Sequence, residues 1–74
     1  MKIIFDAPGK IISGEELGRY VKLLDDTQIS GGYLILTAAS LDMRDDGFDN
    51  WVGSMEDLRR YFKEANWIVE WVGQ

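Results

Sequence analysis

The sequence predicts a single α+β domain over residues 1–74, arranged as a ferredoxin-like β-α-β-β-α-β sandwich with both helices on one face of an antiparallel sheet. Three observations predict this fold: a segment that occurs twice, the helical pattern of both copies, and an apolar strand-like segment after each copy. The chain then divides into two similar halves, residues 2–37 and 41–72. The alternative is a ββαβαβ order, which begins with a β-hairpin.

The repeated segment is Ser54–Ala65, and its earlier copy is Ser13–Leu24. Aligned without a gap, the copies are identical at Ser13/Ser54, Glu15/Glu56, Leu17/Leu58, Arg19/Arg60, Tyr20/Tyr61 and Lys22/Lys63. Because the match covers caps, charges and apolar positions together, it indicates that both segments form the same element.

Each copy has the pattern of an amphipathic helix. Ser13 and Ser54 are typical N-cap residues, whose hydroxyl groups accept hydrogen bonds from amides of the first turn. Carboxylates follow in each first turn, where the helix dipole favours negative charge. Apolar residues recur at spacings of three and four, which are Leu17, Tyr20, Val21 and Leu24 in one copy and Met55, Leu58, Tyr61, Phe62 and Ala65 in the other. Gly18 weakens the first helix by up to about 1 kcal/mol relative to Ala, and Asn66 ends the second.

Strands are expected around these helices. β-branched and aromatic residues predict strands at Lys2–Phe5, Tyr33–Thr37 and Trp67–Val72. Alternation of apolar and charged residues predicts a half-exposed strand at Ser40–Arg44. Tyr33–Thr37 is apolar on both faces and is expected to be covered on both. In the last strand, Trp67, Val69 and Trp71 are expected to share one side.

The remaining segments read as turns and loops. Asp6–Gly9 has turn chemistry, and Lys10–Ile12 leads into the first helix or forms a short hairpin strand. Asp25–Gly32 and Asp45–Asn50 are polar loops. One feature conflicts with the ferredoxin-like order. In that fold the third strand is central and buried, whereas Asp42–Gly47, which falls at its place, is too charged for a buried strand. A short strand or an edge strand at that place therefore stays open.

Composition excludes several classes of function. The chain has no Cys and no His, which excludes disulfides and Cys/His metal clusters. Its 13 acidic and 8 basic residues give a net charge of −5, which disfavours direct binding to nucleic acid. Met1–Phe5 is too short for a secretion signal, and no apolar run approaches the length of a membrane span. We therefore expect a cytoplasmic protein with no membrane partner.

The sequence also disfavours a metal-binding, phosphate-binding or catalytic site. The acidic stretch Asp42–Asn50 fails the calcium-loop pattern, because Arg44 and Gly53 occupy positions where ligands are required. No phosphate-binding loop is present, since Ser30–Gly32 lacks the P-loop lysine and hydroxyl. Glu70 is a candidate acid or base only if it is buried, and an exposed face suits it better. We expect no enzyme activity, no metal and no cofactor.

Binding to another protein remains. The sequence predicts a small acidic inhibitor of a basic protein, such as a nucleic-acid-binding protein or a nuclease. Phage-encoded anti-defence proteins and immunity proteins that block nuclease toxins offer an analogy of size, charge and missing catalytic groups. The candidate partner-binding residues are Asp42, Arg44, Asp45, Asp46, Asp49, Asp25 and Asp26.

Two alternatives stay open. One is a self-associating structural or regulatory domain, with a homodimer formed through Trp67, Val69 and Trp71. The other is a domain that binds a small ligand.

Overall fold

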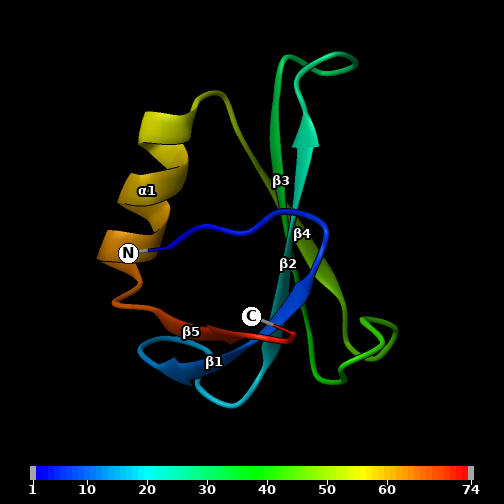
Figure 1. The fold of residues 1–74 in the computed structure, drawn as a ribbon, viewed down its shortest axis with the longest axis vertical. Helices are drawn as coiled ribbons and strands as arrows, with labels where there is room; N and C mark the ends of the chain where they lie inside the picture. The colour runs from blue at the N-terminus through cyan, green and yellow to red at the C-terminus, as the bar shows by residue number, and fades with distance from the viewer. Residues whose placement is uncertain (1, 74) are drawn as a thin grey trace.

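The computed structural model describes residues 2–73, which form five strands and one helix (Figure 1). The elements in chain order are β1 (Pro8–Ser13), β2 (Tyr20–Asp26), β3 (Gly32–Ala38), β4 (Phe48–Val52), α1 (Met55–Glu64) and β5 (Ile68–Trp71). All strands belong to one antiparallel sheet with the order β4-β3-β2-β1-β5. Strands β1 to β4 therefore form a meander, and α1 connects β4 at one edge to β5 at the other.

The longest ladder of the sheet joins β2 to β3. Their register runs from Tyr20 opposite Ala38 to Asp26 opposite Gly32, without a break. This pairing places Val21, Leu23 and Ile35 on the same face, where all three are fully buried. The opposite face carries Leu34 and Leu36, which are only partly buried. Tyr33–Thr37 is therefore less covered on this face than the sequence predicts, since the residues there are half-buried.

The core lies between α1 and the sheet. Leu58 and Phe62 of the helix are buried against the sheet residues, and Phe62 contacts the Trp67 ring edge-on at a centroid distance of 5.1 Å. In Figure 1 the N-terminal segment runs from the helix side across to the sheet. Phe5 of this segment stacks on Tyr33 of β3, with ring centroids 5.6 Å apart. Buried aromatic area of this kind is what stabilises a chain of this size without disulfides.

Helix α1 confirms the second of the two predicted helices. Asp57 N donates to Ser54 Oγ at 3.1 Å, so Ser54 is the N-cap as expected. The helix stops before Asn66, which has a φ of 56° and reverses the chain direction toward β5. Arg60 pairs with Glu56 and Asp57 on the exposed side, where ion pairs add little stability.

The first predicted helix is wrong. Ser13–Leu24 forms the end of β1, a tight loop and most of β2. Gly14 and Gly18 have φ values of 97° and 92°, which a right-handed helix does not contain. These two glycines stand where the helical copy has Met55 and Arg59. The two segments are thus similar in sequence but form different structures.

The ferredoxin-like fold is wrong for the same reason, because the described chain has one helix on a five-stranded sheet. The ββαβαβ alternative also needs two helices and fails with it. Further corrections concern the strands: Lys2–Phe5 and Ser40–Arg44 are not strands, whereas Lys10–Ile12 lies in β1 and Phe48–Asn50 in β4. Edge strand β4 is largely exposed and contains Asp49 and Asn50, which is why its sequence resembles a loop.

The last predicted strand is confirmed as β5, and its two sides are as expected. Trp67 and Trp71 are buried, and Val69 packs against the core. Ile68, Glu70 and Val72 are exposed on the other side. In residues 2–73 no helix has the length and apolar character needed to cross a membrane.

The two loop glycines allow a test of this fold. Gly14→Ala is expected to lower the free energy of unfolding by about 2–4 kcal/mol, because it combines a left-handed φ with a collision between the new Cβ and Asn66 O. Gly18→Ala is the matched control, since it has the same strain and no atom within 4 Å of its Cβ. We expect it to cost about 1–2 kcal/mol. Urea unfolding measures both, and stabilisation by either alanine would indicate a helix instead.

Candidate acidic site

Two acidic loops lie at the same end of the sheet. The β1–β2 loop (residues 14–19) carries Glu15 and Glu16, and the β3–β4 loop (residues 39–47) carries Asp42, Asp45 and Asp46. They are neighbours because β2 begins where β3 ends, with Tyr20 paired to Ala38. The antiparallel register therefore brings together acids that are far apart in the sequence.

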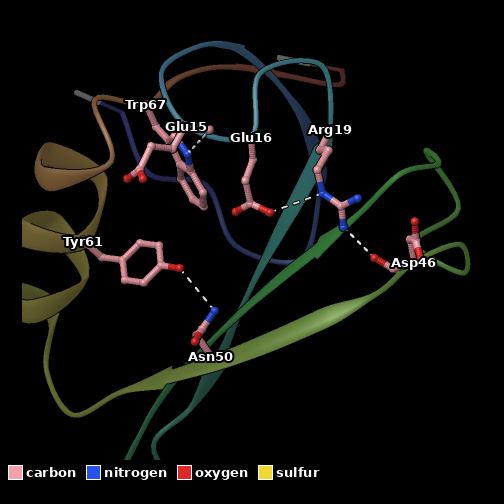
Figure 2. A network of polar contacts seen from close by, with 7 residues as sticks. All are labelled: Glu15, Glu16, Arg19, Asp46, Asn50, Tyr61 and Trp67. Atoms are coloured by element: carbon pink, nitrogen blue, oxygen red, sulfur yellow. Dashed lines mark hydrogen bonds and ion pairs between the residues drawn. The ribbon is translucent and has the colours of Figure 1, made fainter.

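Arg19 connects the two loops (Figure 2). Its Nε atom lies 3.2 Å from Glu16 Oε1, and its Nη2 atom donates to the backbone oxygen of Asp46. The guanidinium also lies over the Phe48 ring, 5.5 Å from its centroid. Arg19 Nε is buried without a hydrogen bond of good geometry, so its contact with Glu16 is an ion pair. One side chain thus fixes the spacing of both loops.

The β1–β2 loop is also attached to the C-terminal end of α1. Glu15 N donates to Ala65 O at 2.9 Å, and Trp67 Nε1 donates to Glu15 O at 2.6 Å (Figure 2). The first bond satisfies one of the carbonyl groups that a helix leaves unpaired at its end. Backbone contacts therefore hold the Glu15 and Glu16 carboxylates close to the helix C-terminus.

An open pocket of about 400 Å³ lies between this loop and the helix. We call it the acidic pocket, and its lining residues are Glu15, Glu16, Tyr61, Glu64, Ala65 and Trp67. Tyr61 and Trp67 contact each other edge-on, with ring centroids 5.4 Å apart. Asn50 Nδ2 of β4 donates to Tyr61 Oη at 3.2 Å and connects the helix side of the pocket to the sheet. The pocket thus combines three carboxylates with two aromatic rings.

The charges of the pocket act on Tyr61. Burial raises the pKa of the Tyr61 hydroxyl above 10.0, and the nearby carboxylates of Glu16 and then Glu15 raise it further. Both causes favour the neutral phenol.

The β3–β4 loop holds most of the residues that the sequence predicted for partner binding. Asp42 accepts hydrogen bonds from Ser40 Oγ and Arg44 N, which lower the pKa of its carboxyl group. This carboxylate therefore stabilises the turn. Within residues 2–73, no hydrogen bond or ion pair engages the exposed carboxylates of Asp45 and Asp46. Asp49 is exposed in β4, directly after the loop.

The other two predicted residues lie elsewhere. Asp25 and Asp26 are at the far end of β2, five and six residues along the ladder from Tyr20. Hydrogen bonds from the Thr27 hydroxyl and the Thr27 amide lower the pKa of Asp25, so its carboxylate supports the β2–β3 turn. The structure thus does not join Asp25 and Asp26 to the acids of the β3–β4 loop.

The structure also shows where the residues lie that were considered for a homodimer, for acid–base chemistry and for metal binding. Trp67 and Trp71 are 5% and 7% exposed, so they fill the core and are not available to pair sheets in a homodimer. Glu70 is exposed, as its alternation indicated. Residues 2–73 contain no group of three or more His, Cys, Asp or Glu side chains placed to hold a metal ion.

Sequence reasoning missed the acidic pocket. It assigned Glu15 and Glu16 to the first turn of a helix, and Tyr61 to a buried stripe. The signal that could have revealed the loop is Gly14-Glu15-Glu16-Leu17-Gly18, in which two glycines enclose the acids. Nothing in the sequence places Glu64 and Trp67 beside them, because that contact depends on tertiary structure.

The raised pKa of the Tyr61 hydroxyl can be tested by titration. Glu16→Gln is expected to lower the pKa of Tyr61, because it removes the larger of the two charge contributions. Nuclear magnetic resonance of tyrosine labelled at Cζ follows the titration. Glu56→Gln is the control, since Glu56 lies in the first turn of α1, outside the pocket. Equal Tyr61 titration in all three proteins would show that the glutamates do not face it.

The same shift predicts a dependence of stability on pH. Because the folded pKa exceeds 10.0, the folded state holds its proton longer than the unfolded state. The free energy of unfolding is then unaffected below pH 10 and falls as the pH rises through the folded pKa. Tyr61→Phe should remove this part of the alkaline loss in urea titrations.

No protein-family model, curated protein or solved structure matches this chain. The candidate site is therefore defined by its own residues and contacts.

Proposed function

We propose that this protein is a non-enzymatic binding module that blocks a basic protein with the acidic pocket and the β3–β4 loop. The observation that carries the proposal is the gathering of Glu15, Glu16 and Glu64 at the C-terminal end of α1. In this class, a small acidic protein occupies a groove that otherwise holds nucleic acid.

Electrostatics supports a binding role because these carboxylates gather negative charge at one place on the surface. A helix C-terminus carries partial negative charge and adds to it. Of the three glutamates, only Glu16 has an ion-pair partner in the described chain. Glu15 and Glu64 are therefore open to a cation from a partner.

The chemistry of the pocket suits a cationic side chain. Lys and Arg are attracted to carboxylates through charge-assisted hydrogen bonds and to the faces of aromatic rings. The acidic pocket offers both, with Tyr61 and Trp67 beside the glutamates. A bound Lys or Arg would supply the cation that Glu15 and Glu64 lack in the described chain.

The β3–β4 loop supports the same partner class over a longer range. Asp45, Asp46 and Asp49 extend the negative surface away from the pocket, with Arg44 as an added cation in the loop. A surface of one sign accelerates association with a surface of the opposite sign, and this effect weakens as salt increases. Nucleic-acid-binding proteins and nucleases present such basic surfaces.

Charge reversal at the two ends of the sheet tests the proposal. We expect Asp45→Lys with Asp46→Lys to reduce capture of the basic partner by about tenfold or more and to flatten its salt dependence. The immobilised protein is exposed to lysate of its source cells at low and high salt, and bound proteins are identified by mass spectrometry.

The matched control is Asp25→Lys with Asp26→Lys, which changes net charge equally at the other end of β2. Capture should then remain within about threefold of the unmodified protein. Unchanged capture by the Asp45/Asp46 variant would reject the role of this surface. Equal loss in both variants would mean that net charge alone is responsible.

A further inference from the structure

Strand β4 has a free edge. It pairs with β3 on one side, and among the described residues no strand follows it in the sheet. A free edge presents backbone N–H and C=O groups that can pair with another strand. Pairing of this kind is a common way in which a sheet binds an extended peptide.

The edge has few of the features that normally prevent such pairing. Those features are charged residues, above all Lys, or Pro in the strand, a β-bulge, or a very short strand. Asp49 is the one charge that β4 carries. Phe48–Val52 contains neither Lys nor Pro, and its five residues pair with β3 in regular register. The other edge, β5, has four residues and an irregularity opposite Ile11–Ser13. Of the two edges, β4 is therefore the better suited to accept a strand.

The side chains of β4 are exposed and differ between its two faces. Phe48 is 62% exposed and Trp51 is 52% exposed. The Trp51 ring lies over Gly32, and its Nε1 donates to Ser30 Oγ at 2.9 Å, so its position is fixed. Alternation places Asp49 and Trp51 on one face and Phe48, Asn50 and Val52 on the other.

We infer that the free edge of β4 pairs with an extended segment of the basic partner, in which Lys or Arg alternates with apolar residues. This inference rests on the proposed function and specifies how the partner is held. Asp49 is the one charged residue of the strand, and Asp45 and Asp46 precede it. The three carboxylates outnumber the nearby cations Arg19 and Arg44, and Arg19 already lies over Phe48 and bonds to Asp46 O. This excess of negative charge favours a cationic segment.

The alternation follows from the two faces of β4. A residue of the added strand beside Asp49 meets a carboxylate, which favours Lys or Arg. Residues beside Phe48 and Val52 meet apolar side chains, which favours Val, Ile or Leu. The backbone bonds themselves do not depend on sequence, so the side-chain pattern provides the specificity.

A pair of peptides tests the inference with the complete protein. The probe is acetylated and amidated Lys-Val-Lys-Val-Lys-Val-Lys, and the control peptide has the same residues in two blocks, four Lys followed by three Val. Amide hydrogen exchange of the ¹⁵N-labelled protein is followed in residues 48–52. We expect the alternating peptide to slow exchange of alternate β4 amides by about tenfold or more, and the block peptide to have little effect there.

Two variants complete the experiment. Asp49→Lys places the residue that natural edges use to prevent pairing, and it should abolish the protection. Glu70→Lys makes the same charge change on β5, and the alternating peptide should still slow amide exchange in β4 of this variant. Protection by both peptides, or protection that persists in Asp49→Lys, would overturn the inference. Changes in the amide resonances of Glu15, Glu16 or Asp45 without slower exchange in β4 would overturn the inference and leave the proposed function supported. No effect of the peptide at either place would count against both.

Discussion

The pairing of β2 with β3 is the constraint on which the other features depend. Its unbroken register places Val21, Leu23 and Ile35 on the face that α1 covers. It also decides which loops are neighbours, because the β1–β2 and β3–β4 loops both leave the sheet at the Tyr20–Ala38 end. A shift of one residue would turn each buried side chain of β2 to the other face. Core and acidic surface therefore depend on the same ladder.

The two ends of this ladder have different roles. At the Asp25–Asp26 end, a carboxylate supports the turn through Thr27. At the other end, Arg19 and the C-terminal end of α1 hold the two loops in place, while several carboxylates keep their charge exposed. Local stability explains Asp25 and, in the β3–β4 loop, Asp42, but not the exposed carboxylates of Asp45 and Asp46. That contrast supports a function for the acidic pocket and the β3–β4 loop.

The sequence predicts elements well where local signals decide. Helix α1 has a serine N-cap, one apolar stripe and a stop at Asn66, and all three are found in the structure. Strand β2 was missed because Leu17, Tyr20, Val21 and Leu24 fit helical spacing as well as Val21 and Leu23 fit a strand. Tertiary pairing with β3 and the positive φ values of Gly14 and Gly18 decide between the two. The edge strand β4 buries few side chains, so its sequence shows no alternation.

The candidate site was predicted in part. Asp42, Arg44, Asp45 and Asp46 do share one loop, because they are neighbours in the chain. The pocket could not be predicted, since its glutamates come from a loop and a helix that are about fifty residues apart in the sequence. Arg19, which joins the loops, stood in a segment predicted as helical. Its role appears only once β2 is known to be a strand.

The most direct test of this account is a nuclear Overhauser measurement on residues 14–38. The β2–β3 ladder predicts contacts between backbone protons of Val21 and Thr37, and of Leu23 and Ile35. A series of contacts between residues three positions apart through residues 14–24, with no contacts to residues 32–38, would show a helix there. That result would contradict the sheet, the neighbouring acidic loops and the binding surface derived from them.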